Sequence, residues 1–236
     1  MQKFICALII TASSVLAHAQ APGRVDTVIT PDASNKDLVE YKIRYPDGKT
    51  RSIGNLLNGK KEGIWRTYNN RNIIETIREY HDDKLSGISF RFTESGAVDL
   101  EENYKNDMLH GSRSTFLYNG VLKSIENYVN GRLDGERTLF YDGGRMQEKS
   151  NFKNGVRDGI STWYNQEEKP TIQYTYKMGV IEGPAKFYTN GILQSEGMFH
   201  NDNEEGEWKV YEDGSVLKTI TYKAGTIIKE TAAKKK

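Results

Sequence analysis

Beyond its first twenty residues, this chain has three histidines and several acidic pairs, which are residue types used for metal binding or acid–base chemistry. They include His81, His110 and His200, and the pairs Asp82-Asp83, Glu101-Glu102 and Glu204-Glu205. Imidazole nitrogens are common zinc ligands, and a zinc site needs three or four ligands at one point. Paired carboxylates suit calcium binding or glycoside hydrolysis, which also require groups to converge. Whether these residues can act therefore depends on the elements that position them.

An octet of residues recurs along the chain at nearly constant spacing, for example YVNGRLDG at 128–135 and YKMGVIEG at 176–183. The closing glycines of the octets are Gly63, Gly87, Gly111, Gly135, Gly159, Gly183 and Gly206, separated by 24, 24, 24, 24, 24 and 23 residues. Five residues after each glycine comes an aromatic residue: Tyr68, Phe92, Phe116, Phe140, Tyr164, Tyr188 and Tyr211. A period of this length indicates stacked copies of one supersecondary unit.

Each 24-residue unit contains two turn signals, one in the octet and one such as Asn119-Gly120, which leaves two segments of strand length. Asn-Gly pairs supply the positive φ angles of tight hairpin turns. The pattern predicts an all-β fold, an elongated single-sheet array of about seven β-hairpin repeats with terminal capping strands. At roughly 4.8 Å per strand, about fourteen repeat strands would span on the order of 65 Å. Trp65 and Tyr68 follow Gly63 by two and five residues, and this opposite parity predicts a bulge between them.

The N-terminal segment has the features of a secretory signal peptide: a basic Lys3, an apolar run over residues 4–16 and the small-residue ending Ala17-His18-Ala19. Export would place the protein in the periplasm, on the outer surface or outside the cell. The predicted organisation is a signal peptide at 1–20, a linker at 21–37, a repeat domain at 38–230 with caps at 38–57 and 215–230, and a basic tail at 231–236.

Composition excludes several classes of partner and linkage. Removal of Lys3 with the signal peptide leaves 32 basic and 32 acidic residues, and nucleic-acid binders instead carry a basic surface. The only cysteine, Cys6, lies in the predicted signal peptide, so no disulfide is expected in the mature chain. No transmembrane segment is expected either, because the longest apolar run is shorter than the roughly 20 residues that span a bilayer.

The recurring aromatic-x-Asn-Gly-x-x-x-Gly octet, followed by a strand with Trp or Tyr, resembles the MORN-repeat family in its bacterial variant. The resemblance covers about residues 56–225. It implies elongated arrays of β-hairpins that bind proteins or lie against membranes, and some members of the family are described as antitoxins. It implies no shared catalytic motif.

A hairpin array keeps the candidate chemical residues apart. His81 and His200 occupy the same slot five repeats apart, which is about 48 Å if each hairpin adds roughly 9.6 Å. His110 is predicted to lie in a turn, one repeat beyond His81, as a surface residue. The acidic pairs are scattered along the array, and residues 202–207 lack the spacing of a calcium loop. No catalytic residue, metal site or cofactor is therefore predicted.

The unit at 159–182 departs most from the repeat. Trp163 and Tyr174 occupy positions that are usually not aromatic, and the loop at 166–170 lacks the turn glycine. Phe187 occupies the slot of Trp163 in the next unit. Two interpretations are open: Trp163, Tyr174 and Phe187 form a contact patch for a partner, or they repack the core around the altered loop.

These features predict an exported, non-enzymatic protein-interaction or scaffold module in the bacterial cell envelope or outside the cell, with another protein as its partner. Two alternatives remain open. Regularly spaced aromatic residues could stack on the sugar rings of a cell-surface polysaccharide, and the resemblance leaves room for an antitoxin-like protein that neutralises its partner.

Overall fold

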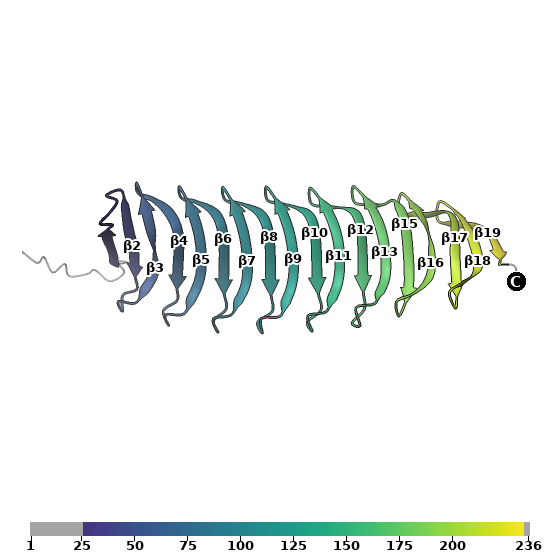
Figure 1. Ribbon diagram of the computed structural model, residues 1–236, viewed down its shortest axis with the longest axis horizontal. Coiled ribbons are helices and arrows are strands. Elements are labelled where there is room, and N and C mark those ends of the chain that lie inside the picture. The colour runs from purple at the N-terminus through teal and green to yellow at the C-terminus, as the bar shows by residue number, and fades with distance from the viewer. Residues whose placement is uncertain (1–25, 234–236) are drawn as a thin grey trace, which may run out of the picture.

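The computed structural model describes residues 26–233 as one open antiparallel sheet of 19 strands, with no helix among them. Strands adjacent in sequence are neighbours in the sheet, so the hairpins follow one another along a long ribbon (Figure 1). The predicted all-β hairpin array is confirmed. Within residues 26–233 no helix is long and apolar enough to cross a bilayer.

The strands are β1 (Asp26–Pro31), β2 (Leu38–Arg44), β3 (Thr50–Leu57), β4 (Lys60–Tyr68), β5 (Ile74–His81), β6 (Lys84–Phe92), β7 (Val98–Lys105), β8 (Met108–Phe116), β9 (Leu122–Val129), β10 (Arg132–Phe140), β11 (Met146–Lys153), β12 (Val156–Tyr164), β13 (Pro170–Lys177), β14 (Val180–Ile181), β15 (Gly183–Thr189), β16 (Ile192–His200), β17 (Asn203–Glu212), β18 (Ser215–Lys223) and β19 (Thr226–Ala232). Both β14 and β15 pair with β13, so they act as one interrupted strand.

The octet turns are two-residue turns in which both residues have positive φ. In the octet at 128–135, Asn130 has φ 49° and Gly131 has φ 78°. These angles match a type I′ turn, whose twist suits a hairpin. The octet turns of successive repeats also bond to one another: the Gly131 amide donates to Leu109 O at 2.7 Å, and the Gly155 amide to Leu133 O at 2.7 Å. The backbone thus links each repeat to the next along one edge of the ribbon.

The closing glycine of each octet marks a place where the pairing widens. Between the pairs Leu133–Tyr128 and Arg137–Glu126, strand β10 has three residues where β9 has one. Gly135 lies in this widening with φ 109°, and a Cβ there would lie 3.3 Å from the Cβ of Asn127. The Asn127 amide side chain donates to Glu136 O at 2.8 Å. Glycine is therefore required both for its φ angle and for the close approach of the asparagine.

A second irregularity occurs near the other turn of each hairpin, and it corrects the predicted bulge. Thr67 pairs with Thr76, but Tyr68 pairs with Ile74. The extra residue lies in β5, so the bulge is in the second strand of the hairpin and not in the first. The side chains of Tyr68 and Trp65 therefore project from opposite faces of the sheet. Equivalent aromatics lie on the face opposite the tryptophans, as shown by the hydroxyl of Tyr211 that donates to Glu196 Oε1 at 2.7 Å.

The ends of the array differ from the predicted boundaries. Residues 26–31 of the predicted linker form β1, which pairs with β2 from Asp26 opposite Arg44 to Pro31 opposite Val39. The prolines and polar residues around this segment led to its prediction as a linker, but it forms a short strand that pairs with the edge of β2. At the other end β19 extends two residues into the predicted basic tail, to Ala232. The predicted signal peptide at 1–20 and the last residues of the tail, 234–236, lie outside the described residues.

Candidate functional site

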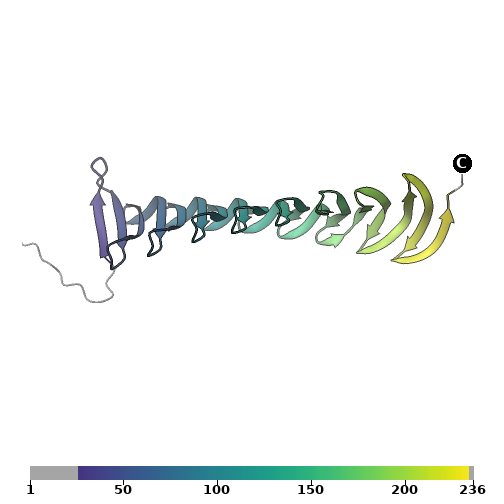
Figure 2. The same cartoon turned by 90° about the horizontal axis from the view of Figure 1, so that it is seen from below.

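One line of side chains runs along a single face of the ribbon, with one residue from each strand between β3 and β18 except the two-residue β14. Cross-strand partners in an antiparallel sheet project from the same face, so the register aligns these residues. We call this line the central row. It consists of Gly54, Trp65, Arg78, Ser89, Glu102, Arg113, Glu126, Arg137, Ser150, Ser161, Tyr174, Ala185, Gly197, Trp208 and Ile220. The strands curve, most strongly toward the C-terminal end (Figure 2).

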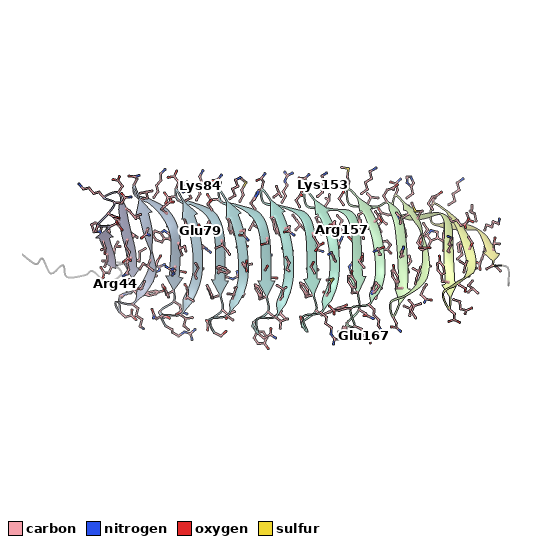
Figure 3. The ribbon with its side chains drawn as sticks, in the orientation of Figure 1. Arg44, Glu79, Lys84, Lys153, Arg157 and Glu167 are labelled. Atoms are coloured by element: carbon pink, nitrogen blue, oxygen red, sulfur yellow. The ribbon has the colours of Figure 1, made fainter. Side chains whose placement is uncertain are left out.

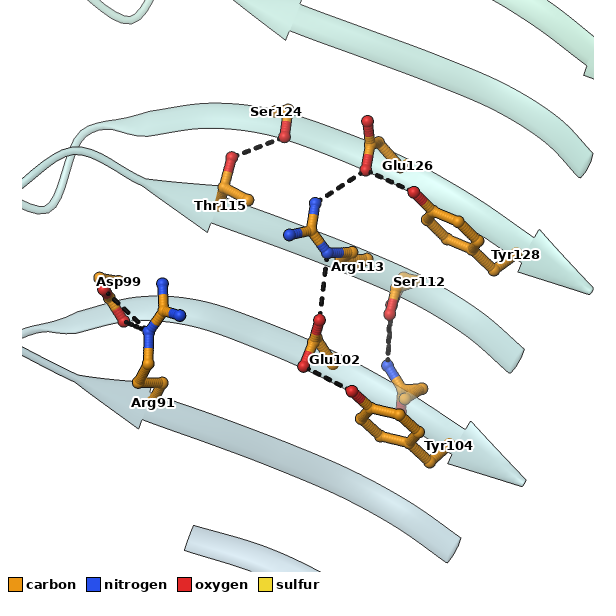
Figure 4. Close-up of polar contacts among 11 residues, drawn as sticks. Arg91, Asp99, Glu102, Tyr104, Ser112, Arg113, Thr115, Ser124, Glu126 and Tyr128 are labelled. Carbon is orange, nitrogen blue, oxygen red and sulfur yellow. Dashed lines mark hydrogen bonds and ion pairs between the residues drawn. The ribbon is translucent and has the colours of Figure 1, made fainter. Parts of the chain in front are cut away.

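In β7–β9 the central row is an ion-pair ladder with excess negative charge. Arg113 Nε lies 3.1 Å from Glu102 Oε1, and its Nη1 lies 3.0 Å from Glu126 Oε2 (Figure 4). The hydroxyls of Tyr104 and Tyr128 donate to the same two carboxylates, at 2.8 and 3.0 Å. Burial and the hydrogen bond to Glu102 raise the pKa of Tyr104 to about 12. One arginine between two carboxylates leaves a net charge of −1; we call these three residues the acidic group.

In β10–β12 the charge balance is reversed, and positive charge is in excess. Glu148 Oε1 accepts hydrogen bonds from Arg137 Nη2 at 2.7 Å, Arg157 Nη2 at 2.7 Å and Ser150 Oγ at 2.6 Å. Glu148 is only 6% exposed. Burial opposes its ionisation, but the hydrogen bonds from Ser150, Arg137 and Arg157 outweigh burial and lower the pKa of Glu148. Two guanidinium groups on one carboxylate leave a net charge of +1; we call Arg137, Glu148 and Arg157 the basic group.

From β12 to β17, aromatic side chains lie in the central row and beside it. The Tyr174 ring lies 6.0 Å from Trp163, 5.7 Å from Phe187 and 5.5 Å from Phe199, centroid to centroid, with nearly perpendicular planes. Phe199 also meets Trp208 edge-on at 5.5 Å. Such edge-to-face pairs are favourable beyond their buried area. These five rings form what we call the aromatic cluster.

The structure therefore brings the predicted trio Trp163, Tyr174 and Phe187 together. Tyr174 and Phe187 pack against the buried Ala185, Phe199 and Trp208, while all three residues of the trio stay partly exposed. The trio combines core packing with an accessible surface, and a role in partner contact stays a prediction. Sequence reasoning did not single out Phe199, because the residue that opens the octet is aromatic in most repeats. It took Trp208 as a repeat position that matches Trp65.

The two tryptophans of the central row are held in the same way near opposite ends of the array. Each indole lies over a glycine of the preceding strand, Trp65 over Gly54 and Trp208 over Gly197, and leaves no room for a Cβ there. Each indole N–H donates to the carbonyl that follows this glycine, Asn55 O at 3.0 Å and Met198 O at 3.2 Å. The row between β4 and β17 is thus bounded at each end by a buried tryptophan.

The histidines do not gather into a metal site. His81 Nδ1 lies 3.0 Å from Glu62 Oε1, which raises the pKa of His81. His200 makes the equivalent contact with Glu182, at 2.9 Å. The placement of His110 in a turn was wrong: the octet turn takes only two residues, so His110 lies in β8. Within residues 26–233 no three His, Cys, Asp or Glu side chains are grouped to hold a metal ion.

A family model described as MORN repeat variant matches residues 109–130 and 133–154. Each matched segment covers one hairpin, β8–β9 and β10–β11, and the two follow each other in the array. Over these two hairpins the chain is similar to the MORN repeat variant. MORN repeats are in general modules for interaction with proteins or membranes and are not enzymes. The matched hairpins carry most of both charged groups, including Arg113 and Glu148. No curated protein matches the chain.

Proposed function

We propose that this chain is an exported, non-enzymatic interaction module that binds a partner protein through the face that bears the central row. The observation that carries the proposal is the alignment, on one face, of an acidic group, a basic group and an aromatic cluster across β7–β18. Arginine and aromatic side chains are the residues most enriched at the centres of protein interfaces.

The partial exposure of these side chains supports the proposal. The Arg113 side chain is 27% exposed and that of Arg157 is 29% exposed, so both are held by their neighbours and still open to a partner. A partner that follows the ribbon would meet charge of one sign, then of the other, and then the aromatic rings. Recognition distributed in this way suits a long array, in which each repeat contacts only its neighbours.

The place of action is part of the proposal. The predicted signal peptide at 1–20 supports export, and the predicted mature chain contains no cysteine whose oxidation could interfere outside the cytoplasm. We propose that the protein acts in the bacterial cell envelope or outside the cell.

Site-specific photocrosslinking in the producing cells tests the proposal. A photoreactive phenylalanine analogue would replace Arg91, an exposed residue on the face of the central row, or Lys149, an exposed residue on the opposite face. We expect one defined protein adduct from position 91 and none from position 149, in the exported fraction. Adducts only from position 149, adducts with polysaccharide, or retention of the chain in the cytoplasm would contradict it.

A further inference from the structure

The basic group has more hydrogen-bond donors than acceptors. All three hydrogen bonds to Glu148 converge on the single atom Oε1. In the described part of the chain, Arg137 Nε and Arg157 Nε are buried without an acceptor, and so is the hydroxyl of the fully buried Ser161. Buried polar groups in proteins nearly always have partners. The described residues therefore leave the basic group with donors that its own acceptors do not satisfy.

Aromatic rings hold the two guanidinium groups in place. Arg157 Cζ lies 5.5 Å from the ring centre of Phe152, 5.4 Å from Trp163 and 5.7 Å from Tyr176. Arg137 Cζ lies 4.7 Å from the Phe152 ring. Aromatic faces attract cations and exclude water around them. The arginine side chains remain 20% and 29% exposed, so the basic group is preorganised and reachable from the surface.

The excess charge and the donor geometry define the class of group that fits. A carboxylate supplies two oxygens in the plane that a guanidinium recognises, and such bonds are stronger than those between neutral groups. It would also neutralise the single positive charge that Glu148 leaves on Arg137 and Arg157. Carboxylates occur on acidic protein segments and on uronate sugars.

The surroundings favour a protein carboxylate. A sugar ring binds by stacking on an open aromatic face, but Arg157 already covers the near faces of Phe152, Trp163 and Tyr176. The side chain of Glu or Asp needs no such face. The acidic group offers a second point of attachment of opposite sign, centred on Arg113 in β8. Three strand spacings separate it from Glu148 in β11, or roughly 14 Å.

We infer that the basic group binds a carboxylate of an acidic segment of the partner protein, and that the acidic group binds a basic residue roughly 14 Å farther along that segment. The inference rests on the proposed function, because it names which part of the central row recognises which chemistry. It assigns Arg137 and Arg157 as ligand-binding residues and Phe152, Trp163 and Tyr176 as the residues that position them.

Fluorescence anisotropy of the purified protein with a labelled hexaglutamate peptide, at low ionic strength, tests the inference. We expect saturable binding that Arg157→Gln and Arg137→Gln each weaken at least tenfold. The matched control is Arg91→Gln, which removes the same charge from the same face outside the basic group and should change affinity less than twofold. Equal weakening by Arg91→Gln, or unchanged binding by Arg157→Gln, would overturn the inference.

A gain of binding guards against variants that merely misfold. Glu148→Gln removes the internal carboxylate and should tighten hexaglutamate binding at least threefold, which a misfolded chain cannot imitate. Oligogalacturonate is the comparison probe: if it binds the basic group more tightly than hexaglutamate, the occupant is a glycan and the inference is wrong. Crosslinking at position 91 separates the two proposals. If Arg157→Gln leaves the protein adduct intact, this inference fails and the proposed function stands; if no protein adduct forms at all, the proposed function fails.

Discussion

The middle of the array and its C-terminal end use the same backbone to hold different side chains. In β7–β12 the face of the central row carries ion pairs among Arg113, Arg137, Glu148 and their neighbours, whereas in β13–β18 it carries packed rings around Trp208. The turns and the closing glycines are alike in both regions. The 24-residue repeat therefore determines the path of the chain and leaves the central row free to vary in chemistry.

The two regions should differ in how much each side chain contributes to stability. Burial of an aromatic side chain removes a large apolar area from water, at about 25 cal/mol per Å². Ion pairs whose side chains are about a fifth to a third exposed, as Arg113 and Arg137 are, contribute less because solvent screens them and desolvation opposes them. We expect stability to be concentrated in the aromatic end and recognition to depend on the charged middle.

The largest effect is expected from Trp208→Ala. Trp208 is 4% exposed and packs against Phe199 and Tyr222, so its loss leaves a cavity that a thin sheet cannot fill. We expect a loss of about 3–5 kcal/mol in the free energy of unfolding, measured by urea denaturation. Trp65→Ala is the matched variant at the other end. A loss below about 1 kcal/mol for Trp208→Ala would contradict the expectation that stability is concentrated in the aromatic end.

A substitution at Gly197, the glycine that the Trp208 indole covers, tests the same packing. Gly197 does not have positive φ, and Ala at this position differs only by a Cβ that meets the Trp208 indole. Gly197→Ala should destabilise by about 1–3 kcal/mol, because the indole must shift. Gly143→Ala is the control, since a Cβ there meets nothing within 4 Å and its φ is not positive either. Equal unfolding midpoints in urea for the two variants would show that Trp208 is not tightly seated.

A smaller, pH-dependent effect is expected in the charged middle from Glu148→Gln. Because the folded pKa of Glu148 lies below its usual value, its charge contributes stability above the unfolded pKa, near 4.3, and this is lost as pH falls through the folded pKa. Glu148→Gln should cost about 1–2 kcal/mol at pH 7. The cost should shrink toward pH 3, as followed by thermal melts.

Glu167→Gln is the control for this titration. Glu167 pairs with Lys169 at 2.8 Å, but both side chains are about half exposed or more. Figure 3 shows Glu167 at the turn edge, far from Arg157 in the body of the sheet. Its replacement should leave the melting curve unchanged at every pH. A Glu148→Gln variant with the same melting temperature as wild type at pH 7 would show that the basic group makes no net contribution.

The comparison also shows why the sequence predicted the array but not the central row. Asn-Gly turns and glycines at a 24-residue period are local signals, and they were sufficient for hairpins, strand lengths and order. Glu102, Arg113, Glu126 and Arg137 are successively 11, 13 and 11 residues apart in sequence, so no single fixed spacing pairs them. They face one another only because the pairing widens at Gly111 and Gly135. Strand β1 escaped prediction because its residues alternate too weakly among prolines.

The smallest effect is a gain of stability at a turn shared by both regions. Met178 has φ 52° in the octet turn, where the other repeats place Asn or, once, Asp, and it is 78% exposed. The left-handed conformation costs most L-residues about 1 kcal/mol, and Asn less. Met178→Asn should therefore raise the free energy of unfolding by about 0.5–1 kcal/mol, and Asn154→Met, in the preceding repeat at φ 50°, should lower it by a similar amount. Urea denaturation measures both. Equal and opposite changes would show that the turns have the same energetics under the charged middle and under the aromatic end. The two regions would then differ only in the side chains of the central row and its neighbours. Unequal changes would mean that these side chains alter the backbone conformation of the turns.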